Sequence, residues 1–597
     1  MPQHQANSVP KVARRLVRSR RLAAELRRSG PFGPGAPAEP GAGDEYAPVR
    51  TTLDATIRPV GSGRYRRLGW APGEAHLLRD DLGAAPAPDR AARRRSLLYA
   101  AHHTDVHVCD AQSPARLVGG ESFGWVNPGS DSGHRPQETC TAQVFDALVQ
   151  ATNAVRTSPV SGAEMAWCVQ TGDNTDNRTA AEVDWWLGVL NGTEIVPNTG
   201  LDGRYEGIQR SGWKAVWHPD RAGYDRRQRE GFPHLPGFLD AAVAPFRPAG
   251  LDVPWFAVFG NHDQLFQGTF GEAAGPPHIG RLDALLRGGD RSPVSAAALV
   301  RAIALATVAG GDPERYARLQ LGPGVLRVAA DPDARRALPV EEYLARLLEP
   351  ANAGAGPVGH GFGPEHLAAG TTWWSRPAGP GIQLVALDSC HHTSGDGGRL
   401  GPRQTAWLEA ELQRHHSRWL DPTGRPVDGG PGAEDRLVIV ASHHSSWTID
   451  NTREDEVDPG PATDGAALVA LLDRYPNVVL WLNGHSHEHR IAAHPRPGTG
   501  RGWWEVNTAS AIDFGQQGRT IELFDNGDGT LSILSTVLDH RSDPAVPYRH
   551  PDGFTPARLA SISRELAAND DRWFDPMDQL GGPEDRNAEL ILRSPLP

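Results

Sequence analysis

Cysteine is scarce in this sequence, with four residues among 597, and no two of them form a C-x-x-C pair. Such pairs are typical of zinc ribbons and redox motifs, so we expect neither, and the thiols are predicted to be free and structural. Long apolar runs are also missing, because no stretch approaches the roughly 18 residues that span a membrane. The most apolar stretch, 296–309, is interrupted by Arg301 and predicts a buried helix. We therefore expect no membrane span.

Positive charge is in deficit, because 60 Lys and Arg stand against 72 Asp and Glu, which gives a formal net charge of -12. This balance disfavours a general nucleic-acid binder. Glycine and proline are abundant, with 67 and 51 residues, and 17 Trp lie in a chain that is 39% hydrophobic. These numbers indicate a sizeable core with long loops. The length permits about four domains or one catalytic domain with long insertions, and we expect the second.

Residues 1 to about 50 differ in composition from the rest. A basic segment, 11–28, precedes a Gly- and Pro-rich stretch, 30–43, and this composition predicts a disordered basic arm. An amphipathic helix on an anionic surface is the alternative for the basic segment. The pair Arg14-Arg15 is typical of a twin-arginine export signal, but charge resumes at Arg18 before any apolar region follows. We therefore expect a cytoplasmic protein, with export as the alternative.

From about residue 96 the sequence alternates between short apolar runs and amphipathic helical stretches, which indicates an α/β protein. Helices are expected at 141–155, 402–416 and 464–475. Two intervals, 177–253 and 264–371, are far longer than the median connection of about 4 to 6 residues. We interpret them as insertions on the substrate side, with surface elaboration as the alternative. The first insertion carries Trp185, Trp186, Trp213 and Trp217.

Five apolar runs of this region end in polar residues of one kind. The runs are 97–101, 165–169, 255–259, 437–441 and 478–482, and each is typical of a buried strand. In open α/β sheets, ligands bind beyond the carboxyl ends of the strands, so the polar side chains that follow should meet at one place. They are Asp105 and His107, then Asp173, then Asn261, His262 and Asp263, then His443 and His444, and finally His485 and His487.

These residue types fit a centre that holds two metal ions. Hard or borderline cations take oxygen and imidazole ligands, and one ligand must contact both ions, which a carboxylate does and an imidazole does not. Mn, Fe and Zn all accept such ligands, so the sequence does not choose among these divalent or trivalent ions. The His-x-His turn at 485–487 proves little alone, because most such pairs are hydrogen-bonded surface residues. The four other strand ends favour metal binding.

The five strand ends carry the motifs D-x-H at 105–107, G-D-x-x-D at 172–176, G-N-H-D at 260–263, H-H at 443–444 and G-H-x-H at 484–487. In order and spelling they resemble the calcineurin-like metallophosphoesterase superfamily. The wide motif spacing is similar to that of a long-insert bacterial branch whose members often carry twin-arginine signals. Purple acid phosphatases of this superfamily carry a tyrosine where this chain has Asp176, so a purple iron site is not expected.

The resemblance, which covers about 96–538, implies an α/β fold, namely a two-sheet α/β/β/α sandwich with long insertions. The expected organisation is a disordered arm at 1–50, an N-terminal extension at 51–95 and a catalytic domain at 96–540. A C-terminal helical and polar extension at 541–597 follows. The resemblance says nothing of the parts outside its range.

The same resemblance assigns roles to individual residues. It implies that one metal ion is held by Asp105, His107, Asp173 and His487. The other ion is held by Asn261, His443, His485 and again Asp173, which bridges the two. It makes His262 the catalytic imidazole, which protonates the leaving-group oxygen or stabilises charge on the phosphoryl group, and it gives Asp263 the role of orienting His262.

Neighbouring residues are expected to support this set. His444 would contact substrate, next to Ser445, which stands where the family usually has proline. His489 is expected at the rim or behind the ligands, and His102 and His103 are expected to be packed or hydrogen-bonded inside the protein. Three more residues are expected behind the ligands, namely Asp110, Asn174 and Asp176.

The implied function is hydrolysis of a phosphate monoester or diester by attack of a metal-bridging hydroxide. The partner is then a small phosphate ester, and the Trp-rich insertion could line a cleft for its second substituent. A nuclease of the same superfamily is one alternative, disfavoured by the acidic balance. A metal-bound binding protein without turnover is the other, disfavoured because every ligand position and His262 are present. The sequence does not indicate the oligomeric state.

Overall fold

The computed structural model describes residues 51–113, 116, 133–200, 203–264, 267–269, 331, 333–393, 395–430, 432–496, 501–570 and 575–596, with short pieces between 291 and 327. The predicted arm at 1–50, with its arginine pair, lies outside the described residues, as does most of 264–330. In the described part, no helix has the length and apolarity needed to cross a membrane. All four cysteines are free and buried, as predicted.

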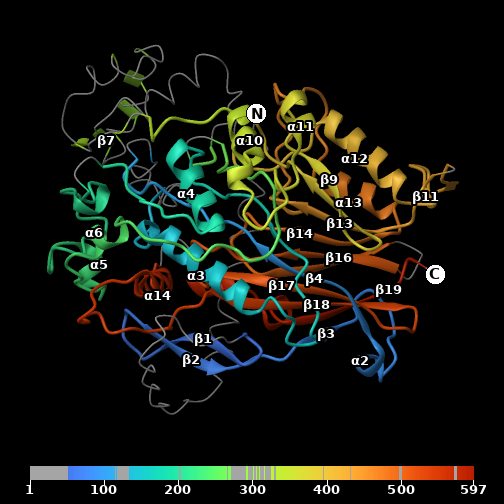
Figure 1. Ribbon diagram of the computed structural model, residues 1–597, viewed down its shortest axis with the longest axis horizontal. Helices are drawn as coiled ribbons and strands as arrows, with labels where there is room; N and C mark the ends of the chain where they lie inside the picture. The colour runs from blue at the N-terminus through green and yellow to red at the C-terminus, as the bar shows by residue number, and fades with distance from the viewer. Residues whose placement is uncertain are drawn as a thin grey trace, which may run out of the picture.

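Two large β-sheets form the centre of the molecule. The first has seven strands in the order β3-β19-β18-β17-β4-β5-β6, with bounds Leu77–Arg79, Ala588–Arg593, Thr530–Asp539, Gln517–Asp525, Arg95–His103, Trp167–Gln170 and Trp255–Ala257. The second has six strands in the order β15-β16-β14-β13-β10-β9, with bounds Arg490–Arg496, Arg501–Asn507, Val478–Asn483, Leu437–Ser442, Ile382–Leu387 and Trp374–Gly379. Figure 1 shows these sheets one above the other.

Both sheets bury their facing sides in one shared hydrophobic core. Three tryptophan indoles also join the sheets by hydrogen bonds. Trp167 Nε1 of β5 donates to Ala378 O of β9 at 2.8 Å, and Trp374 Nε1 of β9 donates to Ala257 O of β6 at 3.0 Å. Trp504 Nε1 of β16 donates to the β19 carbonyl of Ile591 at 3.1 Å. Each indole therefore buries a large apolar surface without leaving its N–H unsatisfied.

Helices cover the outer faces. Leu408 and Leu412 of α12 (Pro402–Arg414), with Leu468 and Leu472 of α13 (Gly465–Asp473), pack on the outer side of the six-stranded sheet. On the other sheet lies α3 (Thr141–Ala154), and α4 (Ala180–Asn191) and α14 (Pro556–Ala567) pack against α3. The predicted α/β/β/α sandwich is confirmed, and the three expected helices begin and end within two residues of α3, α12 and α13.

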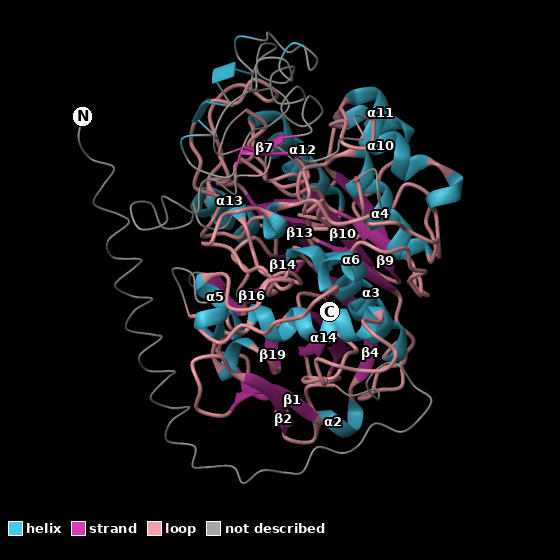
Figure 2. Ribbon diagram, turned by 90° about the vertical axis from the view of Figure 1, so that its left-hand side faces the viewer, coloured by secondary structure: helices cyan, strands magenta, loops and turns pink. Residues whose placement is uncertain are grey.

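Smaller elements complete the described part. Three two-stranded sheets pair β1 (Ala55–Val60) with β2 (Arg67–Pro72), β7 (Arg291–Pro293) with β8 (Val325–Arg327), and β11 (Arg418–Leu420) with β12 (Pro426–Asp428). Short helices are α2 (Arg90–Arg93), α5 (Arg226–Arg229), α6 (Phe238–Ala242), α10 (Val340–Leu348) and α11 (Pro364–Ala369). Turns of 3₁₀ helix lie at Glu138–Cys140, Ile208–Arg210, Pro350–Asn352, Pro576–Leu580 and Pro583–Asp585. In Figure 2, β1 and β2 lie at the end of the molecule opposite α10 and α11.

The predicted domain boundaries cut through the seven-stranded sheet. β19 lies beyond residue 540, yet it pairs with β18 along six residue pairs from Thr530 to Ser535. β3 lies before residue 96 and pairs with β19. The sequence did not indicate this, because strand pairing between the two ends of a chain leaves no local pattern. Residues assigned to both extensions are therefore part of the sandwich.

The tryptophans of the first predicted insertion do not line an open cleft. Trp185, Trp186 and Trp217 are buried, with at most 7% of their surface exposed. Trp186 lies in α4, packs edge-on against Trp255 of β6 and donates its indole N–H to Gln170 Oε1 at 3.0 Å. The expectation of a Trp-lined substrate cleft is therefore wrong for these three residues, because they pack the core.

Candidate metal centre

The five polar strand ends meet at one edge of the sandwich. Strands β4, β5 and β6 run parallel, as do β10, β13, β14 and β16, so their carboxyl ends lie at common edges. Backbone bonds join the loops that follow: the N–H of Asp105 donates to Gly172 O at 3.1 Å, and the N–H of Gly484 donates to His443 O at 2.9 Å. The His485 N–H donates to Asp105 Oδ2 at 3.0 Å and so connects the two sheets.

The motif glycines allow this convergence. A Cβ atom on Gly260 would lie 2.1 Å from the backbone nitrogen of Asp173, and one on Gly484 would lie 2.0 Å from Thr104 Oγ1. Neither position leaves room for a side chain. The glycines that precede Asn261 and His485 therefore let loops of different strands touch.

Backbone strain is concentrated at the predicted ligands. Nine non-glycine residues of the described chain have a positive φ, and five of them belong to the predicted ligand set. Such conformations are costly for residues with a Cβ and cluster where function requires a fixed side-chain direction. The five residues and their φ angles are Asp105 (51°), His107 (43°), Asp173 (52°), His485 (68°) and His487 (55°).

The first group of ligand atoms surrounds one point. His487 Nε2 lies 3.2 Å from Asp105 Oδ1 and 3.3 Å from His107 Nε2, and His107 Nε2 lies 3.5 Å from Asp173 Oδ2. Asp105 Oδ1 is buried and accepts no hydrogen bond from any residue that the structure describes. Two imidazole nitrogens and two carboxylate oxygens therefore surround one point.

The second group has the same form. His443 Nε2 lies 2.9 Å from Asn261 Oδ1 and 3.2 Å from Asp173 Oδ2. His485 Nδ1 lies 3.1 Å from Asn261 Oδ1 and 3.2 Å from His443 Nε2. Asp173 Oδ2 belongs to both groups, while its Oδ1 accepts the backbone N–H of His262 at 2.7 Å. One carboxylate thus stands between the two sets.

These separations fit two metal ions. Ligand atoms about 2.1 Å from one ion lie about 3.0 to 3.4 Å apart when they are arranged around it. Most of the distances above fall within a few tenths of an ångström of this range. Together with the orphaned Asp105 oxygen, this spacing makes the residues a suitable pair of ligand sets.

The local charges follow from the buried carboxylates. Burial lowers the pKa of His107, but the nearby carboxylates of Asp105, Asp176 and Asp173 outweigh it and raise the pKa to about 10. Burial likewise acts against His443, yet Asp173 and Asp105 raise its pKa to about 9. In His485, burial and the charge of His443 dominate, and its pKa falls to about 3.

The structure corrects the role expected for Asp263. Its carboxylate accepts the backbone N–H groups of Asn174, Thr175 and Gly260 at 3.0 Å, so it ties the second motif to the third. The carboxylate beside the imidazole of His262 is that of Asp176, whose Oδ1 lies 3.2 Å from His262 Nδ1. Side chains of consecutive residues in this turn point in different directions, so adjacency in sequence did not reveal the partner.

No protein-family model and no curated protein matches the sequence. Among solved structures, a dimetal phosphatase from Danio rerio matches at 12% identity over 75% of this chain and 100% of that one, with a TM-score of 0.31. A purple acid phosphatase from yellow lupin (Lupinus luteus) seeds matches at 10% identity over 82% and 68%, with a TM-score of 0.25. At TM-scores this low the similarity does not assign a function to this chain.

Other predicted residues take supporting positions. Both ring nitrogens of His444 are engaged, Nδ1 with Ser389 Oγ at 2.9 Å and Nε2 with Asp396 O at 2.9 Å, while the ring packs 4.2 Å from that of His485. His444 therefore supports His485 and leaves no ring nitrogen for substrate, contrary to expectation. His489 is buried, with Arg519 and Gln517 on its ring nitrogens, and does not lie at a rim.

The remaining predictions concern buried polar residues. His102 contacts Thr171 and Thr508 through its two ring nitrogens, and His103 contacts Thr152, so both are hydrogen-bonded inside the protein as predicted. Asn174 donates to Asp263. Asp110 Oδ2 accepts Arg335 Nε at 3.1 Å.

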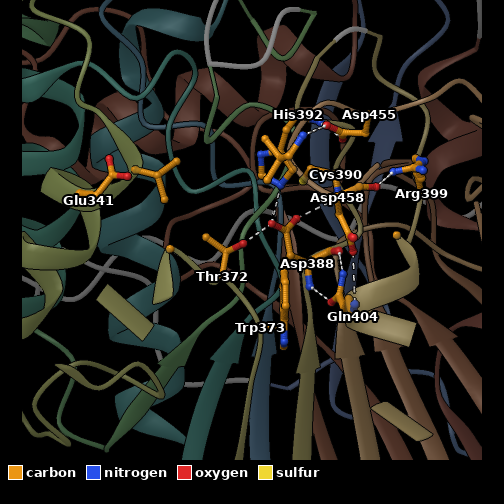
Figure 3. A pocket seen from close by; sticks show the side chains of 14 residues that line it. Glu341, Thr372, Trp373, Asp388, Cys390, His392, Arg399, Gln404, Asp455 and Asp458 are labelled. Atoms are coloured by element: carbon orange, nitrogen blue, oxygen red, sulfur yellow. Dashed lines mark hydrogen bonds and ion pairs between the residues drawn. The ribbon is translucent and has the colours of Figure 1, made fainter. Parts of the chain in front are cut away.

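A sixth strand end was missed by the sequence analysis. The fully buried strand β10 is followed by Asp388, Ser389 and His392, and Ser389 Oγ accepts the backbone N–H of His444 at 2.9 Å. Asp388 Oδ2 contacts His392 Nε2 at 2.7 Å, and the pair lies in a cavity of about 180 Å³ (Figure 3). The signal was present, because an apolar run followed by Asp and His is the pattern of the other five ends.

Proposed function

We propose that this protein is a phosphoric ester hydrolase that depends on two metal ions. Asp105, His107 and His487 hold one ion, and Asn261, His443 and His485 hold the other, with Asp173 shared between them. The observation that carries the proposal is the shared oxygen, Asp173 Oδ2, which lies 3.5 Å from His107 Nε2 and 3.2 Å from His443 Nε2. A pair of ions bound there would supply Lewis acidity to a phosphoryl oxygen and would activate a water molecule as the nucleophile.

His262 is suited to transfer a proton to the leaving group. Its Nδ1 lies 3.2 Å from Asp176 Oδ1, which fixes the ring and leaves Nε2 for a substrate oxygen. Its ring centroid lies 4.4 Å from that of His107, so the imidazole stands beside the ligand groups. The His262 side chain is 17% exposed, so this imidazole lies between the candidate ligands and the solvent.

The function is tested by hydrolysis of p-nitrophenyl phosphate and bis-p-nitrophenyl phosphate, before and after removal of metal with a chelator and after addition of Mn²⁺. The proposal expects turnover that is lost with the metal and restored by it. Preference between the two substrates then decides between monoester and diester. If neither compound is cleaved and Asp173→Ala binds metal as well as wild type, the protein is not this enzyme. Single-stranded DNA as a third substrate tests the nuclease alternative.

A further inference from the structure

Two buried carboxylates stand behind the histidines of one ligand group. His487 Nδ1 contacts Asp513 Oδ2 at 2.8 Å, and His107 Nδ1 contacts Asp176 Oδ1 at 3.4 Å. A carboxylate on the outer nitrogen of an imidazole fixes its tautomer and makes the inner nitrogen a stronger metal ligand. Both inner nitrogens, Nε2 of each ring, face the point described above.

Each of these carboxylates is in turn held by an arginine. Arg135 Nε donates to Asp513 Oδ1 at 2.7 Å, and Arg116 Nη1 donates to Asp176 Oδ2 at 2.5 Å. The four side chains are at most 5% exposed. Buried charges of this kind are tolerated only when they are paired and hydrogen-bonded, so each arginine restricts where its carboxylate can sit.

Glu138 joins the two arginines. Its Oε2 accepts Nη2 of Arg116 at 2.7 Å and the backbone N–H of Arg135 at 2.9 Å, and its Oε1 contacts His134 Nδ1 at 2.7 Å. The side chain is fully buried. Burial raises the pKa of Glu138, but the charges of Arg116 and His134 outweigh burial and hold it below its ordinary value. The group is therefore ionised at neutral pH.

A continuous buried chain of contacts thus runs from one histidine to the other. It passes from His487 through Asp513 and Arg135 to Glu138, and from there through Arg116 and Asp176 to His107. We propose that Glu138 is a positioning residue which, through this chain, sets the affinity of the metal position formed by Asp105, His107 and His487. The inference rests on the proposed metal-dependent function and assigns a residue that no motif contains.

The other metal position has no such support from charged groups in the described chain. His443 Nδ1 donates to the neutral carbonyl of Thr171 at 2.8 Å, and His485 packs against the ring of His444. Loss of the Glu138 charge should therefore weaken one position and spare the other. A general loss of folding would weaken both.

The test measures binding of Mn²⁺ alone to the full-length, metal-stripped chain by calorimetry, with element analysis after dialysis. Glu138→Gln keeps the size of the side chain and removes its charge. We expect about 10- to 100-fold weaker binding at one of the two positions and wild-type binding at the other. Wild-type affinity at both positions in Glu138→Gln overturns the inference. Wild-type protein that takes up no second ion overturns the proposed function instead.

Electron paramagnetic resonance of the Mn²⁺-loaded variants identifies the weakened position. At limiting Mn²⁺, Glu138→Gln should give the spectrum of His487→Ala and not that of His443→Ala, which removes a ligand of the other ion. A spectrum that matches His443→Ala contradicts the inference.

The matched control is Glu522→Gln. Glu522 is 3% exposed and is bonded by Ser158 and Ser161, so it is an equally buried glutamate outside the network. It should leave both affinities unchanged. If Glu138→Gln does not unfold cooperatively, Arg135→Lys replaces it, because lysine keeps the charge and loses the paired contact with Asp513. Arg135→Lys should weaken the same position by a smaller factor, and equal weakening of both positions overturns the inference.

Discussion

The two halves of the proposed metal centre have different surroundings. In the charged half, which comprises Asp105, His107 and His487, both imidazoles contact buried carboxylates. In the neutral half, which comprises Asn261, His443 and His485, the outer nitrogen of His443 contacts the backbone carbonyl of Thr171, and His485 packs against the ring of His444. Ligand sets that look alike in sequence therefore differ in the groups behind them. We expect the charged half to bind its ion more tightly than the neutral half.

Asp173→Ala should have the largest effect, because it removes the one oxygen that faces both halves. Metal-stimulated hydrolysis of either p-nitrophenyl ester should fall to the rate of the metal-free protein. The check is the rate at saturating Mn²⁺. Substantial metal-stimulated turnover in this variant would show that the halves do not depend on a shared carboxylate.

His262→Ala should lower kcat by about 10²- to 10⁴-fold, the usual contribution of a positioned proton donor. Metal content should stay at the wild-type value, because His262 is not among the ligands of either half. The loss should be smaller for substrates with better leaving groups, which need less protonation. A variant that loses metal and kcat together would place His262 in the charged half as a ligand.

Asp513→Asn and Glu505→Gln form a pair that separates the halves. Asp513→Asn weakens the contact with His487, so Mn²⁺ affinity of the charged half should fall by about 10- to 100-fold. Glu505 instead ties Ser446, which follows the H-H motif, to Asn483, which precedes the G-H-x-H turn. Glu505→Gln should affect the neutral half by a few-fold only, because it acts through loops. Equal effects of both variants on both halves would contradict the proposed difference between the charged and the neutral half.

The pH dependence of metal binding should also distinguish the halves. In the charged half of the metal-free protein, the pKa of His107 is raised to about 10 and the pKa of His487 is also raised. In the neutral half, the pKa of His443 is raised to about 9, but the pKa of His485 is lowered to about 3. Ligand imidazoles must be neutral, so binding at pH 7 releases protons, and affinity rises as pH rises toward these pKa values.

The charged half should release more protons than the neutral half, because His485 is already neutral. Calorimetry in buffers of different ionisation enthalpy measures the number of protons released. Each released proton makes the metal affinity rise about tenfold per pH unit. A binding enthalpy that does not depend on the buffer would show that the imidazoles are neutral before the metal arrives.

The candidate ligand residues could be picked out from the sequence because they follow a local pattern. Buried runs such as 165–169 and 478–482 are followed at once by Asp173 and by His485 and His487, and parallel strands bring such ends together. The structure places all seven predicted ligand residues around two points. Their role as ligands stays a prediction until metal binding is measured.

The groups behind the ligands were not predictable in this way. Glu138, Arg135 and Asp513 belong to no motif, and Arg135 and Asp513 are 378 residues apart in the chain. Contacts of this kind depend on how loops pack, which periodicity does not reveal. The same limit explains the partner of His262, because its neighbour Asp263 turns away and Asp176 takes that place.

The most direct test of the account is titration of metal-stripped wild-type protein with Mn²⁺, followed by hydrolysis and by element analysis at each step. We predict that two ions bind per chain, that the charged half fills first, and that hydrolysis of a phosphate ester appears with the second ion. Full activity with a single bound ion, or no uptake of metal at all, would contradict it.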